Sequence, residues 1–298
     1  MIDKLNQFQW RVAAGGYRFR VLKAVAAQAS ERLYLTASVP FGKQYPGFWY
    51  SPEAGLFLAL AALEPHLDQI IEFANHYGML TGGVWLRLDG SLVSGEPPEL
   101  WHDAIRDLSL AVRMWELIKT GDTSELGQYI KWADSSGVRF ERPADNASAT
   151  GFQGTIPWLP GVVFDGTEEL KDGRWIATRE TNPALLETFQ VGDLLGPAWY
   201  QLQHMVNEKL DSNVSARLLW DHKQLSMHQV PRDLISALWL QFARAIEGNR
   251  EYQQCEECRN WFEVSSPDGG RKDKRFCNTA CRARFWRKTT KREVGGKK

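Results

Sequence analysis

Four cysteines are the side chains of this chain best suited to chemistry. Cys255 and Cys258 are separated by two residues, and Cys277 and Cys281 by three, with 18 residues between the pairs. Two close pairs of thiolates at this separation are typical of a tetrahedral Zn²⁺ site. In the second pair, a spacing of four places both sulfurs on one face of a helical turn, and Asn278 is suited to cap that helix. The spacing therefore predicts a zinc finger.

Two other uses of these cysteines are two disulfides, or four unrelated buried thiols. Disulfides require an oxidising compartment, and residues 1–7 lack the basic-then-apolar pattern of a secretory signal. All four cysteines fall within 27 positions, and the first 254 residues contain none. Four thiolates would fill the coordination sphere of the ion, so we expect structural rather than catalytic zinc.

The charge of the chain is divided between two regions of opposite sign. Residues 255–298 contain 13 Lys and Arg against 6 Asp and Glu, a net charge of +7. The first 254 residues contain 23 against 30, a net charge of −7, so the neutral total hides the division. A basic segment on a zinc module predicts binding to nucleic-acid phosphates, either DNA or RNA.

The basic residues that follow the last cysteines recur at helical spacings, and most of them share one helix face. The residues that we expect to contact phosphates are Arg282, Arg284, Arg287, Lys288 and Lys291. Their alternative role is to offset the charge of a Zn(Cys)₄ centre, which is about −2, or to dock on the acidic body. Nothing in the sequence indicates readout of specific bases.

Two runs around the cysteines, Tyr252–Phe262 and Arg275–Arg282, resemble the CGNR-type zinc fingers of bacterial proteins. After Cys281 this chain reads Arg282-Ala283-Arg284, where that signature has Gly-Asn-Arg. The resemblance implies a treble-clef-like finger behind a larger N-terminal domain, and a role in transcriptional regulation. It covers about 50 residues and gives no function for the preceding part of the chain.

Hydrophobic periodicity before residue 248 alternates between strand and helix patterns, which predicts an α+β body. Gly90–Pro98 is expected to be a loop, and Ser51-Pro52 to open a helix. The predicted strands are 8–12, 17–21, 32–39, 84–88, 158–164, 174–178, 215–220 and 223–228. The predicted helices are 51–65, a second one ending at Tyr77, 99–119, 183–195, 197–210 and 231–247.

The domains that we predict are an α+β body over 1–248 and a finger over 249–298. A polar, Pro- and Gly-containing stretch near 141–151 could subdivide the body. Only six residues separate Gly248 from Cys255, so we expect the finger to be held against the body rather than to move on a tether.

No nucleotide-binding loop, nucleophile elbow or metalloprotease motif occurs, so enzyme activity is not the favoured interpretation. Asp68, Glu72 and His76 lie in line on one predicted helix, where a solvated face is the simplest reading. The longest apolar run, Leu56–Leu63, is too short to cross a bilayer, and we expect a cytoplasmic protein.

Three functions remain open from the sequence. The leading one is a zinc-containing nucleic-acid-binding protein, such as a transcriptional regulator. In the second, the finger is structural and the protein binds a protein partner, another copy of itself or an unidentified ligand of the body. The third is an enzyme with a site in the body, formed by carboxylates from distant segments.

Overall fold

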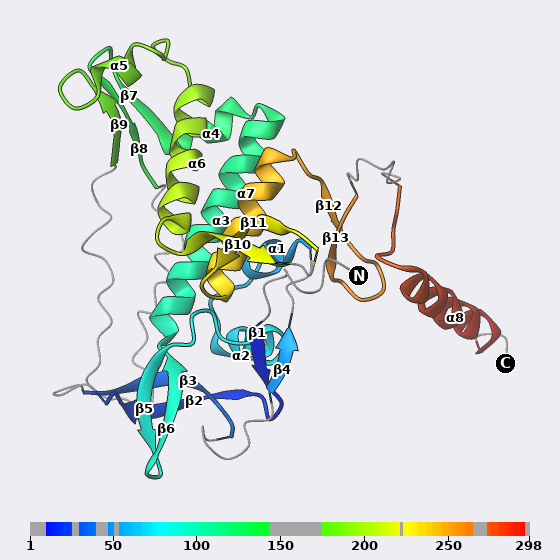
Figure 1. Ribbon diagram of the computed structural model, residues 1–298. Coiled ribbons are helices and arrows are strands. Elements are labelled where there is room, and N and C mark those ends of the chain that lie inside the picture. Colours follow the sequence, from blue (N-terminus) through cyan, green and yellow to red (C-terminus); the bar gives the residue numbers. More distant parts are fainter. Residues whose placement is uncertain are drawn as a thin grey trace. The chain divides into compact units, whose positions relative to one another are not determined.

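The computed structural model of this protein confirms the α+β fold class (Figure 1). It describes residues 10–25, 30–39, 47–50, 54–142, 174–220, 223–264 and 273–295. The chain forms two compact units: unit 1 comprises Met1–Ser109 and Lys209–Lys298, and unit 2 comprises Leu110–Glu208. The finger belongs to unit 1, and its separation from the body at residue 248 stays a prediction.

The main sheet of unit 1 has four antiparallel strands in the order β2-β3-β6-β5. Its strands are β2 (Tyr17–Lys23), β3 (Glu31–Ala37), β5 (Val84–Leu88) and β6 (Ser91–Glu96). The expected loop at Gly90–Pro98 is wrong, because β6 occupies most of it. Asp89 and Gly90 both have positive φ, 48° and 77°, which suits the tight turn of a β5–β6 hairpin.

A second, two-stranded sheet joins β1 (Trp10–Ala13) to β4 (Gly47–Tyr50) in antiparallel register. Gly16 makes the turn after β1, with φ 71° and its N–H donated to the Ala13 carbonyl at 3.0 Å. The pairing of the strands beside it is not local, because β2 pairs with β3 instead.

Four helices supply the core of unit 1. They are α1 (Leu56–Ala61), α2 (Leu67–Tyr77), the first half of α3 (Pro98–Thr120) and α7 (Leu234–Glu247). The large side chains of Trp101, Trp239, Phe57 and Phe242 are fully buried. The first helix begins at Leu56 rather than at Ser51, and residues 51–53 lie outside the described part of the chain. Gly78 ends α2 as predicted.

The remaining element of the unit 1 body is the hairpin of β10 (Val214–Trp220) and β11 (Leu225–Pro231), which was predicted. It leads directly into α7. Asp233 caps α7, because its carboxylate accepts a hydrogen bond from the Ser236 N–H at 3.0 Å.

Unit 2 contains a three-stranded antiparallel sheet in the order β7-β8-β9 and four helical segments. Its elements are the second half of α3, α4 (Thr123–Tyr129), β7 (Ile130–Ala133), β8 (Gly137–Phe140), β9 (Arg174–Thr178), α5 (Pro183–Leu186) and most of α6 (Leu195–Leu210). The sequence reading missed β7 and β8, and the helix expected over 183–195 is one turn only. The strand expected over 158–164 lies outside the described residues, as does most of 141–151.

Among the described residues, no helix combines the length and the apolar character that crossing a bilayer requires.

Candidate metal centre

The four cysteines converge on one point of unit 1. Their sulfur atoms all lie within 4.8 Å of one another. The Cys258 and Cys277 sulfurs are 3.7 Å apart, and those of Cys277 and Cys281 are 3.5 Å apart. Thiolates placed about 2.3 Å from a tetrahedral Zn²⁺ would be about 3.8 Å apart. The four cysteines are unpaired thiols rather than disulfides, and their spacing could hold a metal ion.

A short hairpin presents the first pair. β12 (Tyr252–Gln254) pairs with β13 (Trp261–Glu263), and the turn between them contains Cys255 and Cys258. The Cys255 carbonyl accepts from the Arg259 N–H at 2.8 Å, and the Cys255 N–H donates to the Asn260 carbonyl at 2.9 Å. Arg259 takes a left-handed φ of 64°, which closes the turn and directs both sulfurs to the same side.

The second pair lies at the start of α8 (Thr279–Gly295). The Asn278 side-chain oxygen accepts from the Cys281 N–H at 2.8 Å, which confirms Asn278 as the helix cap. Arg275 joins the two halves of the finger, because its guanidinium donates to both carboxylate oxygens of Glu256 at 2.5 and 2.6 Å. This bidentate pair tethers the turn of the first pair to the segment that precedes the second.

The finger has a small hydrophobic core of its own. Among the described residues, its buried members are Cys255, Phe262, Val264, Phe276 and Cys281. Phe285, four residues after Cys281, packs against this core, with its ring centre 5.1 Å from that of Phe276. The cysteines therefore make up a large part of what the finger buries.

The electrostatics of the cluster favour a cation at its centre. Burial raises the pKa of Cys255, but backbone N–H groups of Cys258, Cys277 and Glu257 donate to its sulfur, and the balance lowers the pKa to about 6. Burial raises the pKa of Cys258, and burial with the neighbouring sulfurs raises that of Cys277 far above its usual value. Four adjacent thiolates repel one another, and a divalent cation removes that cost.

Glu257 separates four of the five predicted phosphate contacts into two pairs. Its side chain is only 7% exposed and forms ion pairs with Lys288 Nζ at 2.5 Å and Arg284 Nε at 3.8 Å. Arg284 also donates to the Cys281 sulfur at 2.9 Å. These two cations therefore have partners within the finger, and sequence reasoning missed Glu257 although it lies between the first two cysteines.

Two of the predicted contacts, Arg282 and Arg287, are exposed on α8. Neither forms an ion pair with a described residue, and Arg287 donates only to the Ala283 carbonyl at 3.2 Å. Trp286 is 52% exposed. Spacings of four link Arg282 to Trp286 and Ala283 to Arg287, so these residues lie on one side of α8. We call this side the free face because its two arginines form no ion pair with a described residue. The side chain of Lys291 lies outside the described residues.

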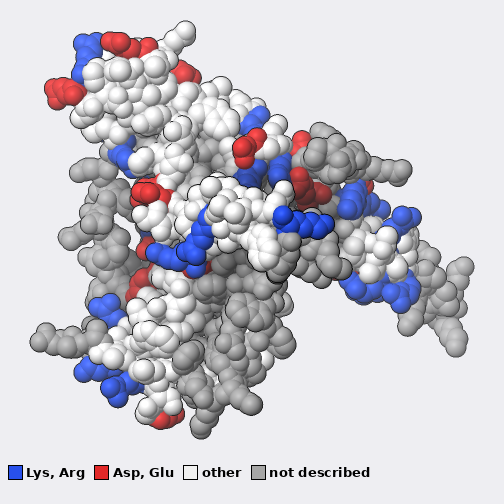
Figure 2. All heavy atoms as spheres, viewed as in Figure 1, with Lys and Arg blue, Asp and Glu red and all other residues white. Residues whose placement is uncertain are grey.

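Basic side chains gather over the finger on the face of the molecule drawn in Figure 2. The finger contacts the body through α1, where the rings of Phe57 and Tyr252 meet edge to face with centres 5.5 Å apart. A side chain added at Gly55, whose φ is 80°, would meet Trp261 and Tyr252 at 3.0 Å. These contacts join the finger to α1, and the Cβ of Trp261 lies beside Gly55. That the finger does not move on a tether stays a prediction.

The three ionisable residues singled out on α2 do not form a comparable site. Asp68, Glu72 and His76 are all exposed, as expected for a solvated face. In the part of the chain that the structure describes, the cysteines are the one group of three or more His, Cys, Asp or Glu side chains placed to share an ion.

Comparisons with protein-family models, with curated proteins and with solved structures find no match to this chain. The similarity to CGNR-type fingers therefore remains a resemblance of motif. What the geometry establishes is a Cys₄ cluster able to hold a metal ion behind an α+β body.

Proposed function

We propose that this protein holds one structural Zn²⁺ at Cys255, Cys258, Cys277 and Cys281, and binds the phosphate backbone of nucleic acid through the free face of α8. The observation that carries the proposal is the division of the α8 cations. Glu257 and the Cys281 sulfur engage Arg284 and Lys288, while Arg282 and Arg287 form no ion pair with a described residue.

Zinc is the metal that this donor set favours. An all-thiolate tetrahedral site with no open position is typical of structural Zn²⁺. The sulfur separations of 3.5 and 3.7 Å fit such a site. The cytoplasm, where thiols stay reduced, is the compartment that suits free cysteines.

Nucleic acid is the partner that the free face favours. Arginine donates in a planar fork that matches phosphate oxygens, and an exposed indole can stack on an unpaired base. The resemblance to CGNR-type fingers supports a role in transcriptional regulation. Two arginines and a tryptophan on one face favour binding that does not depend on base sequence. The choice of target would therefore depend on other parts of the protein.

A purely structural finger is the second candidate, and the engaged cations favour it. Arg284 and Lys288 neutralise Glu257 and a thiolate, as charge compensation predicts. Under this view the basic helix stabilises the metal centre and the protein acts through a protein partner or a ligand of the body.

Two paired variants of the full chain distinguish these functions. Binding of a labelled random duplex DNA and a single-stranded RNA is measured by fluorescence anisotropy between about 50 and 200 mM salt. The variant Arg282→Gln with Arg287→Gln should weaken binding and reduce the slope of log K against log salt by about two, one for each lost phosphate contact.

The matched variant, Arg284→Gln with Lys288→Gln, removes the same charge from the opposite side of the same helix. It should leave the salt slope close to that of the unaltered protein while weakening zinc retention. Equal losses of nucleic-acid affinity in the two variants would contradict binding through the free face. They would show that affinity depends only on the total charge of the helix. Absence of binding by the unaltered protein would leave the structural finger as the function. Zinc content, measured by mass spectrometry, tests the metal independently.

A further inference from the structure

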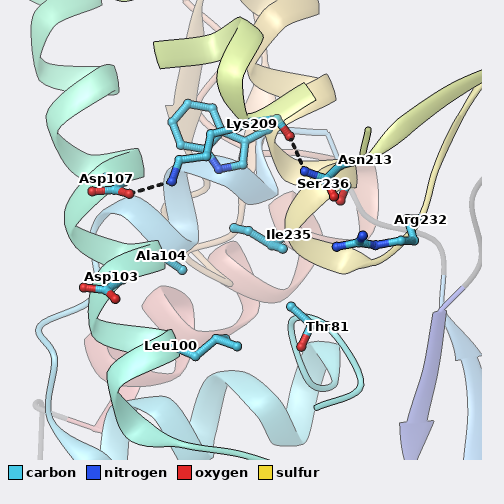
Figure 3. Close-up of a pocket in the computed structure, with 11 residues that line it drawn as sticks. Thr81, Leu100, Asp103, Ala104, Asp107, Lys209, Asn213, Arg232, Ile235 and Ser236 are labelled. Atoms are coloured by element: carbon cyan, nitrogen blue, oxygen red, sulfur yellow. Dashed lines mark hydrogen bonds and ion pairs between the residues drawn. The ribbon is translucent and has the colours of Figure 1, made fainter. Parts of the chain in front are cut away.

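Unit 1 contains a cavity of about 450 Å³ that none of the functions above uses (Figure 3). All of its lining residues belong to unit 1. They come from the first half of α3, the loop after α2, the end of α6 with the turn that follows it, and the segment from the end of β11 into the first turns of α7. The volume lies within the range of small-molecule pockets, which is roughly 300–1,000 Å³.

One part of the wall is apolar. Leu100 and Ala104 come from α3, and Ile235 and Trp239 come from α7. Figure 3 shows Leu100, Ala104 and Ile235 around one space between the two helices. This part of the cavity suits a compact hydrocarbon group of a ligand.

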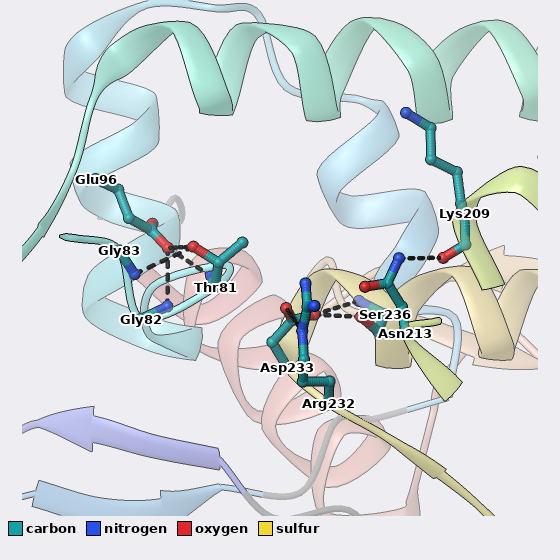
Figure 4. A network of polar contacts seen from close by, with 9 residues as sticks. All are labelled: Thr81, Gly82, Gly83, Glu96, Lys209, Asn213, Arg232, Asp233 and Ser236. Carbon is teal, nitrogen blue, oxygen red and sulfur yellow. Dashed lines mark hydrogen bonds and ion pairs between the residues drawn. The ribbon is translucent and has the colours of Figure 1, made fainter. Parts of the chain in front are cut away.

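Arg232 supplies a charge with unused donors. Its Nε donates to the buried carboxylate of Asp233 at 3.2 Å, and its side chain is 65% exposed. Asp233 is itself fixed by the backbone N–H and the hydroxyl of Ser236 (Figure 4). Among the described residues, the two terminal nitrogens of Arg232 have no further partner. The guanidinium is therefore fixed through Nε. Its two terminal nitrogens, the outer fork, remain available to a ligand.

The other charged groups of the wall are already paired. Lys209 Nζ donates to Asp107 at 2.7 Å, and Asp107 is only 13% exposed. Asp103 pairs with Arg106, from the same helix, at 2.7 Å. The Asp107 and Asp103 carboxylates lower the affinity of the cavity for a dianion without removing the charge offered by Arg232.

A rigid loop forms the edge of the cavity at Thr81. Buried Glu96 accepts hydrogen bonds from the Leu80 N–H at 3.0 Å, the Thr81 hydroxyl at 2.9 Å and the Gly82 N–H at 3.1 Å. The Thr81 hydroxyl in turn accepts from the Gly83 N–H at 3.1 Å (Figure 4). This wall is preformed, which lowers the entropic cost of binding.

We propose that the cavity binds a small organic monocarboxylate with a compact apolar body. The carboxylate would take the outer fork of Arg232 in a bidentate pair, which matches the planar geometry of both groups. The apolar body would lie against Leu100, Ala104 and Ile235. A phosphate ester is the less suitable ligand, because its second charge would face the carboxylates of Asp103 and Asp107. The site is independent of the metal and of nucleic-acid binding.

The test is a titration of the full-length protein with four probes, in which binding is measured by NMR and by calorimetry. Phenylacetate and 4-methylpentanoate carry the expected chemistry, 2-phenylethanol is a neutral analogue, and phenyl phosphate is a dianion. The carboxylates should bind with a Kd of roughly 1 mM, as expected for ligands of this size, and at least about tenfold more tightly than the alcohol and the phosphate.

Two variants locate the site. Arg232→Gln should weaken carboxylate binding at least about tenfold, because the charged fork is lost. Ala104→Phe fills the apolar part without altering any polar contact, and should abolish binding. Arg217→Gln, an exposed arginine on β10, is the matched control and should bind as the unaltered protein does. Near-ultraviolet circular dichroism and zinc content verify that each variant is folded.

Three results would overturn the proposal. The first is no binding of either carboxylate at about 10 mM, roughly tenfold above the expected Kd. The second is equal affinity for the alcohol, which would make the cavity a simple apolar pocket, or tighter binding of phenyl phosphate, which would make it an anion site of another class. The third is unchanged binding in both Arg232→Gln and Ala104→Phe, which would place the ligand elsewhere.

Discussion

The finger and the body core of unit 1 are stabilised in different ways. The body buries large apolar side chains such as Trp101, Trp239 and Phe242 among four helices. The finger buries, among its described residues, three apolar side chains and two cysteines. So small a core does not offset the loss of chain entropy on folding, and a metal ion commonly supplies the difference. The comparison teaches that the finger should depend on its ion and the body should not.

Removal of the metal should have the largest effect. A strong chelator, or the variant Cys277→Ser, should unfold the finger from residue 255 onward, because structural zinc contributes about 10–16 kcal/mol to such modules. The helices α2, α3 and α7 should keep their protection. Hydrogen exchange measured by mass spectrometry reads both regions in one experiment. Retained protection of α8 without metal would contradict the comparison.

Loss of a buried indole should destabilise the body and leave the finger unchanged. Trp101→Ala removes a side chain with no solvent exposure and should lower the free energy of unfolding of the body by about 3–5 kcal/mol. Zinc content should stay unchanged. Trp220→Ala is the matched control, because that indole is 63% exposed and its loss should change stability by no more than about 0.5 kcal/mol. Chemical denaturation followed by circular dichroism gives both values.

The buried carboxylate of Glu96 should give a smaller effect, and one that depends on pH. Burial raises the pKa of Glu96, although the donors at residues 80–82 offset part of the shift. Glu96→Gln places an N–H₂ group against one of those donors and should cost about 1–3 kcal/mol.

The sign of the pH dependence follows from linkage. Between the ordinary pKa of 4.5 and the raised one, the folded state holds a proton that the unfolded state has lost. The stabilisation from Glu96 is therefore complete below pH 4.5 and declines as pH rises through the folded pKa. The difference in unfolding free energy between the unaltered protein and Glu96→Gln should shrink over that interval. Glu180→Gln, on an exposed turn, is the control, and a difference independent of pH would contradict the raised pKa.

The metal centre could be predicted from the sequence because its rules are local. The two cysteine spacings, the Asn278 cap and the packing of Phe285 each depend on residues at most four positions apart, and all three are found in the structure. The faces of α8 could not be predicted in the same way. Arg284 and Lys288 are engaged by Glu257, which lies 27 and 31 residues away and is brought to them by the convergence of the cysteines.

In the body, too, contacts between distant segments could not be predicted from the sequence. Helices with clear periodicity, such as α3 and α7, begin and end within a few residues of their predicted bounds. Apart from the β10–β11 hairpin, strand partners were not predicted, because pairing depends on burial of faces contributed by distant segments. β1 pairs with β4 rather than with β2, and β6 forms where turn-rich sequence had indicated a loop.

The sequence by itself determined that this protein carries a Cys₄ cluster after an α+β body, and that its excess of positive charge lies beside that cluster. Only the tertiary structure decided which arginines the finger uses internally and which it leaves exposed. Only the tertiary structure, too, brought Arg232 beside an apolar wall built from α3 and α7. The physical reason is the same in each case: spacing along the chain fixes neighbours within a turn, whereas charge pairing and cavities depend on which distant segments pack together.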